Sequence, residues 1–218
     1  MTVRGLRAFL ASHGGLRPPW FAVCGTAVLV AIYMLGQPVV GTLVFDPATA
    51  GEAWRLLSGH LVHLNLEHLA WNAGTFVLMS AMAERDLALG PERQLRILLV
   101  GAAAIDLLLW ATSGGASVAY AGLSGVLNAL LAVMLVESWR TTRCPSVLAV
   151  AALSVGKIAY EAATGDTLFV DVPWPAAAEG HAGGFLAGLA YAAVMSRRQT
   201  KGPARTPAPV SGRPSAAR

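Results

Sequence analysis

Polar residues capable of chemistry gather in one apolar part of the sequence, residues 60–72. At membrane depth such side chains persist only where they face a protein interior and find partners. If the segment is helical, His68 and Asn72 lie one turn apart on one face, and His60 and His63 form a similar pair one level up. The pattern fits either a hydrogen-bonded tie between helices or a reactive site.

Two distant segments supply the other parts of a hydrolytic site. Ser124 stands between Leu123 and Gly125, and His181 follows Gly180. A serine, a histidine and a hydrogen-bond-donating amide can serve as the nucleophile, general base and oxyanion stabiliser of a serine hydrolase. We expect neither a metal nor another cofactor, because HExxH is absent and the two cysteines are far from the histidines.

The composition is that of a polytopic membrane protein. Of the 218 residues, 55% are hydrophobic and 13% are charged, and the mean hydropathy is +0.56. In soluble domains about a quarter of the residues are charged. Because a spanning helix needs about 20 mostly apolar residues, the sequence predicts an all-α bundle of six transmembrane helices. Their predicted ranges are 20–42, 60–82, 95–112, 117–137, 146–163 and 179–196.

The predicted bundle forms one domain over residues 20–198. Its first apolar run lacks a small-residue cleavage site, so we expect it to remain as an anchor. Residues 1–19 are expected to form a short cytoplasmic segment before this anchor. Residues 199–218 are rich in Pro, Ser, Ala and Arg, which predicts a disordered basic tail in the cytoplasm.

Basic residues are distributed very unevenly around the predicted spans. Fourteen of the 16 lie before the first span, between the second and third, between the fourth and fifth, or after the sixth. Because cytoplasmic loops carry the excess of Lys and Arg, we predict a multi-pass protein of the inner membrane with both termini in the cytoplasm. The net charge of +4 thus reflects topology and does not indicate nucleic-acid binding.

Depth in the membrane supports a single site. Asn72 and Ser124 each lie 13 residues, and His181 lies 16 residues, from the charged residue that marks the cytoplasmic end of its span. At about 1.5 Å per residue, all three stand about 20 to 24 Å above the cytoplasmic side of a core about 30 Å thick. Glycines beside Ser124 and after His181 allow the fourth and sixth spans to approach closely. We therefore expect the serine and the histidine to lie within hydrogen-bond reach.

At these residues the chain resembles the rhomboid intramembrane serine proteases, over all six spans. The family pattern has Trp-Arg in the first outer loop, His and His-x3-Asn in the second span, Gly-x-Ser-Gly opening the fourth, and Ala/Gly-His-x2-Gly-x3-Gly in the sixth. The matching residues are Trp54, Arg55, His63, His68, Asn72, Gly122 to Gly125, His181, Gly184 and Gly188. Trp54 and Arg55 fit either an interfacial anchor or a shaped loop that covers a site.

The resemblance implies a role for each polar residue. Ser124 would be the nucleophile, and His181 would be the base of a dyad without a carboxylate. His68, Asn72 and the backbone N–H of Ser124 would form the oxyanion hole. His63 would correspond to the structural histidine of the family.

Two further features narrow the resemblance. Asn128 stands where many rhomboids place a tyrosine that stacks on the catalytic histidine, so the imidazole must be oriented in another way. The minimal six-span body, the early His60 and the sequence Gly-Leu-Ser-Gly-Val-Leu look most like rhombosortase, the rhomboid subgroup that processes exported proteins with a C-terminal Gly-Gly sorting signal. The implied partners are the lipid bilayer and transmembrane substrates with a C-terminal anchor helix, cut near the outer face.

The third predicted span contains Asp106, and the fifth contains Lys157 and Glu161. Lys157 and Glu161 stand four residues apart, which allows one helical face to pair its own charges, and we favour a structural role for them. Asp106 has no assigned partner. The alternatives are a general rhomboid protease, a non-catalytic rhomboid-like client-binding protein, which would normally lack Ser124 or His181, and a small transporter, which would show an internal repeat.

Overall fold

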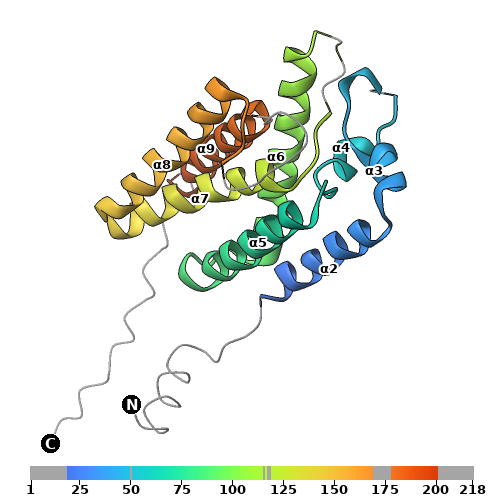
Figure 1. Ribbon diagram of the computed structural model, residues 1–218. Coiled ribbons are helices and arrows are strands. Elements are labelled where there is room, and N and C mark those ends of the chain that lie inside the picture. The colour runs from blue at the N-terminus through green and yellow to red at the C-terminus, as the bar shows by residue number, and fades with distance from the viewer. Residues whose placement is uncertain (1–18, 50, 115, 117–118, 169–177, 201–218) are drawn as a thin grey trace, which may run out of the picture.

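The computed structural model describes residues 19–49, 51–114, 116, 119–168 and 178–200 (Figure 1). In these residues the only strand-like pairing is one antiparallel bridge, between Phe45 and Tyr120, so the predicted all-α class is confirmed. The helical elements are α2 (Trp20–Met34), α3 (Gln37–Leu43), the short 3-10 helix η1 (Pro47–Thr49), α4 (Arg55–Ser58), α5 (Leu66–Asp86), α6 (Pro91–Thr112), α7 (Ser124–Thr142), α8 (Pro145–Thr164) and α9 (Ala178–Thr200).

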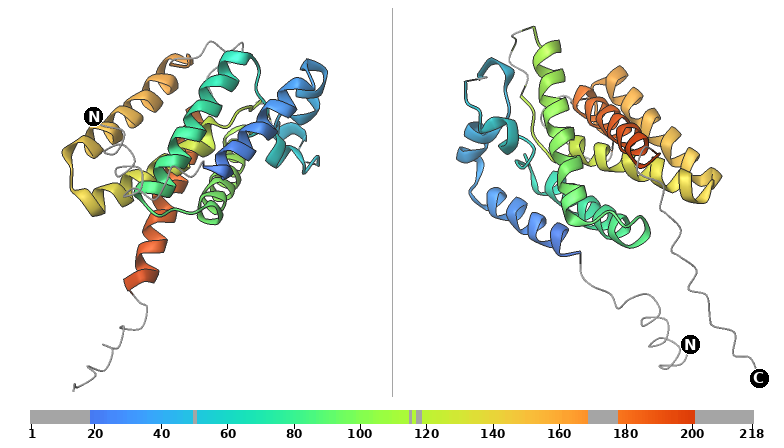
Figure 2. Two further views of the ribbon diagram at one scale, coloured as in Figure 1. Left: turned by 90° about the horizontal axis from the view of Figure 1, so that it is seen from below. Right: turned by 180° about the vertical axis from the view of Figure 1, so that it is seen from behind.

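Three helices form the centre of the bundle. α7 and α9 pack most closely, and α6 lies against both. Ile105 of α6, Leu130 of α7 and Ala192 of α9 have no exposed surface, so the hydrophobic core lies among these helices. α2 packs on α5, while α8 lies at an edge of the bundle, chiefly against α7 and α9 (Figures 1 and 2).

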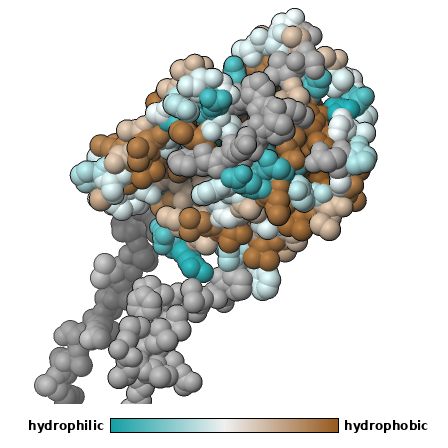
Figure 3. All heavy atoms as spheres, in the orientation of Figure 1, coloured by the Kyte–Doolittle hydropathy of each residue, from teal (hydrophilic) through white to brown (hydrophobic). Residues whose placement is uncertain are grey.

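Large apolar side chains also cover the outside of the helices. Leu107 of α6, Leu153 of α8 and Leu186 of α9 are 64%, 74% and 62% exposed, and Figure 3 shows hydrophobic residues over much of one face. Exposed apolar surface of this extent is unusual for a soluble monomer and fits contact with lipid. Among the described helices, α6 and α8 are long and apolar enough to cross a membrane, and α2 is a shorter apolar helix. The count of six spans remains a prediction.

The predicted first span is divided into two helices. α2 ends at Met34 and α3 begins at Gln37, and Gly36 between them has φ +83°. This left-handed conformation favours glycine. Pro38 follows in the first turn of α3 and lacks the N–H that would continue a hydrogen-bonded helix. The prediction of one helix over residues 20–42 is therefore wrong.

The second predicted span begins later than expected. Asn65 caps α5, because its Oδ1 accepts a hydrogen bond from the backbone N–H of His68 at 2.7 Å. His60 and His63 consequently lie in the loop that precedes the helix, and the prediction that they form a helical pair is wrong. Both side chains are nevertheless buried.

Trp54 and Arg55 fix the segment between α3 and α5, which is the loop predicted to lie at the outer face and is called the outer loop below. The indole Nε1 of Trp54 donates to the Thr42 carbonyl at 3.1 Å. The Arg55 guanidinium donates to the carbonyls of Gly41 and Val44 at 2.8 and 2.7 Å. Because these bonds span 11 to 14 residues of the chain, they favour the shaped loop over a simple interfacial anchor.

The same loop is tied to the segment that leads into α7. Phe45 and Tyr120 exchange backbone hydrogen bonds of 3.1 and 2.9 Å, and the Gly122 N–H donates to the Gly59 carbonyl at 3.0 Å. The outer loop therefore sets the path of the backbone immediately before Ser124.

Candidate active site

Ser124 is the first residue of α7, where it is half-buried. α7 begins at Ser124, later than the start at residue 117 that the sequence predicts for the fourth span. The chain turns first at Gly122, which has φ +116°. A Cβ built on Gly122 would lie 2.6 Å from the ring of His68. A larger residue would therefore meet both backbone strain and a steric clash. Glycine at this position brings His68 close to the turn that presents Ser124.

His181 lies in the first turn of α9 and is buried. Its Nε2 is 2.7 Å from the Oγ of Ser124, which is a hydrogen-bond distance. The structure thus brings together the two residues that the sequence assigns to equal depth. They come from separate helices and stand 57 residues apart in the chain.

Glycines set the approach of α7 to α9. A Cβ built on Gly184 would collide with the Gly125 carbonyl, and one built on Gly188 would collide with the Ala129 carbonyl. The backbones of the two helices are therefore in direct contact at these points, as the glycine spacing predicts. Gly125 is itself crowded by the side chain of Tyr120. The distance between Ser124 and His181 depends on this close packing.

The imidazole of His181 has a second partner. Its Nδ1 lies 2.7 Å from Oε2 of Glu161 on α8. The other carboxylate oxygen of Glu161 accepts a hydrogen bond from the Lys157 ammonium, one turn earlier on the same helix. The expected pairing of Lys157 with Glu161 is confirmed. Ser124, His181 and Glu161 thus form a continuous hydrogen-bonded chain from three helices, although the sequence assigns no carboxylate to His181.

His68 and Asn72 stand one turn apart on α5, and both are buried. The Asn72 Nδ2 donates one hydrogen bond to the His68 carbonyl at 3.1 Å. A Cβ on Gly122 would lie 3.7 Å from the same Nδ2, so Asn72 and the His68 ring both face the turn before Ser124. Both side chains therefore lie near the turn that leads to Ser124, and their role as oxyanion donors stays a prediction.

His63 packs behind His68. The two rings meet edge to face with centroids 4.9 Å apart, and the Nδ1 of His63 lies 3.1 Å from the Leu61 carbonyl oxygen. Burial lowers the pKa of His63 to about 3, and the proximity of His68 contributes to the decrease. His63 is therefore neutral at physiological pH, and its contacts fit a structural histidine that supports the His68 ring.

Asn128 lies one turn after Ser124, at the position where many rhomboids have a tyrosine. Its Nδ2 donates to the Ser124 carbonyl at 2.9 Å. The amide is thus used within α7, and the carboxylate of Glu161 is the acceptor that faces Nδ1 of the His181 ring.

Asp106, which has no partner assigned from the sequence, pairs with His60. The His60 Nε2 lies 3.2 Å from the Asp106 Oδ1, and both residues are buried. The Tyr120 ring meets His60 edge to face, with centroids 5.2 Å apart. Burial raises the pKa of the Tyr120 hydroxyl, and the charge of Asp106 raises it further.

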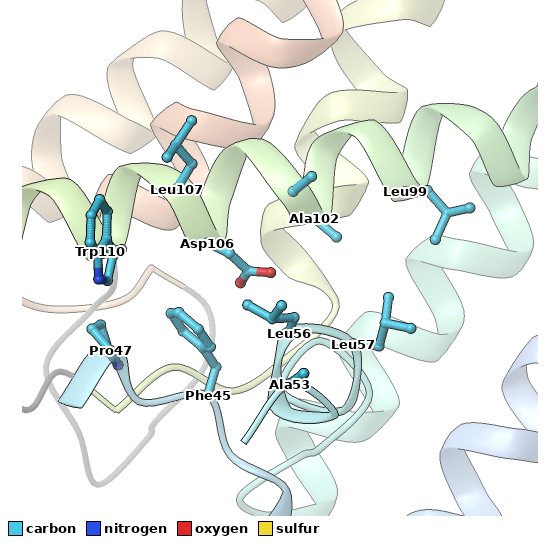
Figure 4. A pocket seen from close by; sticks show the side chains of 11 residues that line it. Phe45, Pro47, Ala53, Leu56, Leu57, Leu99, Ala102, Asp106, Leu107 and Trp110 are labelled. Atoms are coloured by element: carbon cyan, nitrogen blue, oxygen red, sulfur yellow. The ribbon is translucent and has the colours of Figure 1, made fainter. Parts of the chain in front are cut away.

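A cavity of about 540 Å³ lies beside this second pair. Asp106 projects into it from α6, opposite Phe45 and Leu56, and apolar side chains form most of the wall (Figure 4). The cavity does not include Ser124 or His181 in its lining. The two histidine–carboxylate pairs are therefore separate features of the bundle.

Comparison with known proteins places the chain in a family. The family model described as the Rhomboid domain matches residues 50–198. This match covers more than half of the chain, which therefore belongs to the rhomboid family, whose members are intramembrane serine proteases and include some inactive proteins. The family establishes an integral membrane protein, related to enzymes that act on membrane-protein substrates within the bilayer. A comparison with curated proteins finds no match.

Proposed function

We propose that this rhomboid is an active intramembrane serine endopeptidase, with Ser124 as the nucleophile and His181 as the general base. The observation that carries the proposal is the distance of 2.7 Å between Ser124 Oγ and His181 Nε2. An imidazole nitrogen at this distance can take the hydroxyl proton as the oxygen attacks a carbonyl. Inactive members of the family would not need to maintain this contact.

The residues support the following sequence of bond changes. Ser124 Oγ attacks the carbonyl carbon of the scissile peptide bond, its proton passes to His181 Nε2, and the carbonyl oxygen becomes an oxyanion. When the intermediate collapses, the C–N bond breaks and the leaving amine takes the proton from Nε2, which leaves an acyl ester on Ser124. Water then attacks the ester with His181 again as the base, which releases the carboxylic acid and restores the serine.

Three donors can stabilise the oxyanion. The first N–H groups of a helix have no partners within it, so the Ser124 N–H at the start of α7 is available. Asn72 has a second amide hydrogen beyond the one that it donates to the His68 carbonyl. The His68 ring lies at the same turn. We assign the oxyanion hole to these groups.

We also propose that the substrates are single-span proteins cut near the outer face, in the manner of a rhombosortase. A peptide bond inside a helix is shielded by its own turn, so the client must unwind before its carbonyl reaches Ser124. Glycine lowers the cost of leaving a helix by about 1 kcal/mol relative to alanine. The glycines of a C-terminal tail that consists of Gly-Gly, a membrane span and a basic cluster meet this requirement. The excess of Lys and Arg on the cytoplasmic side keeps the basic cluster of such a tail in the cytoplasm.

A serine-directed fluorophosphonate probe tests the catalytic part of this proposal. The wild-type protein in membranes should be labelled, whereas Ser124→Ala should not be. Release of a membrane-anchored test protein with the Gly-Gly tail should follow the same pattern. Labelling or release that persists in Ser124→Ala would overturn the assignment of Ser124 as the nucleophile, whereas a wild-type protein that is not labelled and releases nothing would favour a client-binding protein.

The substrate preference needs its own experiment. Replacing the tail glycines by leucine should reduce release strongly, and an unrelated rhomboid substrate without the motif should be a poor one. Undiminished release of the leucine variant, or equal cleavage of the unrelated substrate, would favour a general rhomboid protease over a rhombosortase.

A further inference from the structure

We propose that Glu161 is a positioning residue for His181, so that the site works as a triad of serine, histidine and carboxylate. The inference rests on the proposed function of Ser124 and His181 and adds to it. It starts from the contact between His181 Nδ1 and Glu161 Oε2, at 2.7 Å.

The burial of Glu161 is exceptional for its helix. Every residue of α8 is described, and Glu161 is the only one that is buried. Its side chain has no exposed surface, whereas apolar residues such as Leu148 and Leu153 on the same helix are 52% and 74% exposed. Burying a carboxylate is unfavourable unless it is paired and hydrogen-bonded. α8 therefore turns its one acidic side chain inward, toward His181.

Both oxygens of Glu161 are occupied by different partners. Oε2 faces the imidazole Nδ1, and Oε1 accepts from the ammonium of Lys157, which is half-buried. The positive charge of Lys157 compensates the buried negative charge. In the described residues, Lys157 and His181 are the charged or titratable groups in contact with Glu161, and His68 of α5 lies beyond His181.

This arrangement selects one tautomer of His181. An ionised carboxylate can only accept hydrogen bonds, so the imidazole proton must reside on Nδ1. Nε2 then presents its lone pair to the Ser124 hydroxyl, which is 2.7 Å away. The carboxylate thus fixes both the orientation of the ring and the nitrogen that acts as base.

Glu161 also contributes to the attack on the substrate. As the proton of Ser124 moves to Nε2, His181 becomes an imidazolium ion, and the carboxylate at Nδ1 stabilises its charge. The Nδ1 proton stays on the imidazole, and Glu161 stays ionised throughout. No aromatic ring is available one turn after Ser124 to do the same, since Asn128 donates its amide to the Ser124 carbonyl.

The test compares Glu161→Gln and Glu161→Asp with the wild type, and uses the fluorophosphonate probe so that no natural substrate is needed. In this reaction Ser124 Oγ bonds to phosphorus, fluoride leaves, and the proton goes to His181. The maximal labelling rate of Glu161→Gln should fall by about 10²- to 10⁴-fold, while the half-saturating probe concentration should change little. Glu161→Asp should retain an intermediate rate, because the charge is kept and only the reach is shortened.

The pH profile of labelling separates positioning from a structural role. The pH profile of Glu161→Gln should differ from that of the wild type, because the negative charge beside the imidazole is absent. Asp106→Asn is the matched control, since it alters another buried histidine–carboxylate pair. Its pH profile should match that of the wild type.

Folding is monitored by gel filtration in detergent. If Glu161→Gln does not fold, Glu161→Asp decides: a reduced maximal rate supports the proposal, and a wild-type rate overturns it. A folded Glu161→Gln variant with the wild-type rate and pH profile also overturns the proposal. If Ser124→Ala in the same series is not labelled, the proposed serine-protease function still stands. Labelling that survives in Ser124→Ala overturns the proposed function itself.

Discussion

The described residues include two buried histidine–carboxylate pairs, and the pairs differ in what the second nitrogen of the histidine contacts. His181 contacts Glu161 through Nδ1 and the Ser124 hydroxyl through Nε2, both at 2.7 Å. His60 contacts Asp106 through Nε2 at 3.2 Å, and its Nδ1 has no hydrogen-bond partner among the described residues. A histidine–carboxylate pair therefore becomes a candidate catalytic base only where a nucleophile is held at the free nitrogen.

The charge balance of the two pairs also differs. Glu161 has Lys157 as a second partner, whereas in the described part of the chain the only ion-pair partner of Asp106 is His60. His60 lies in the outer loop and Asp106 lies on α6. The second pair therefore ties the loop to a core helix, and we interpret it as structural.

The largest expected effect separates the two histidines. His181→Ala removes the proposed base, so release of the anchored test protein should fall to background. His60→Ala should leave the release rate within a few fold of the wild type, because His60 Nδ1 contacts no hydroxyl or thiol among the described residues. Immunoblots of the test protein measure release, normalised to the amount of folded enzyme. An equal loss in both variants would contradict the distinction drawn between the pairs.

Removal of a proposed oxyanion donor should have the next largest effect on the rate. This effect too concerns the site of Ser124 and His181. Asn72→Ala removes one proposed donor, and loss of one such donor costs about 10²- to 10³-fold in rate. Thr75→Ala is the control, because Thr75 lies on the same helix but lines a groove on the surface of α5. Its labelling rate should equal that of the wild type. The labelling rate with the fluorophosphonate measures both. A wild-type rate in Asn72→Ala would remove this residue from the oxyanion hole.

The distance between Ser124 and His181 should be sensitive to helix packing. Gly188→Ala forces a methyl group against the Ala129 carbonyl and displaces α9 from α7. A misplacement of about 1 Å can cost about 10²-fold in rate. Gly156→Ala on α8 is a matched control, because a Cβ there meets open space. The cleavage rates of the two variants should differ clearly, and their thermal stabilities show whether both are folded. Equal cleavage rates would refute the dependence on helix packing.

The smallest expected effects are changes in stability rather than in rate. They follow from changes in the pair of His60 and Asp106. Asp106→Leu leaves His60 buried without its acceptor, which should lower the free energy of unfolding by about 1 to 3 kcal/mol. The double variant with His60→Phe should recover part of this loss, since neither polar group then remains unpaired. Chemical unfolding in detergent measures both. A double variant less stable than Asp106→Leu would contradict a simple hydrogen-bonded tie.

The sequence predicts best those features of the fold and the site that depend on residue type and on depth in the membrane. The all-α class and the rhomboid family are confirmed, and Ser124 and His181 lie within hydrogen-bond distance, as expected from their equal depth. The roles of His68, Asn72 and His63 stay predictions, as do the rhombosortase subgroup and the six spans. Composition and periodicity do not specify these finer properties.

Other features depend on contacts or turns that helical spacing does not encode. Spacing links Glu161 to Lys157 on its own helix, but the contact with His181 requires α8 to dock on α9. Asp106 meets His60 only because the outer loop folds back over α6. Asn65 is a favourable N-cap residue, and this preference indicates a helix that begins after His63.

The inward side chain of α8 has a thermodynamic consequence. Glu161 is the one buried residue of this edge helix, so the contact that supports the proposed base also helps to hold α8 on the bundle. Coupling between two such events is reciprocal. Charging of His181 during the reaction would strengthen the attachment of α8, and anything that draws α8 outward would weaken the base by the same free energy. Docking of this helix and catalysis at Ser124 would thus be two readouts of one equilibrium.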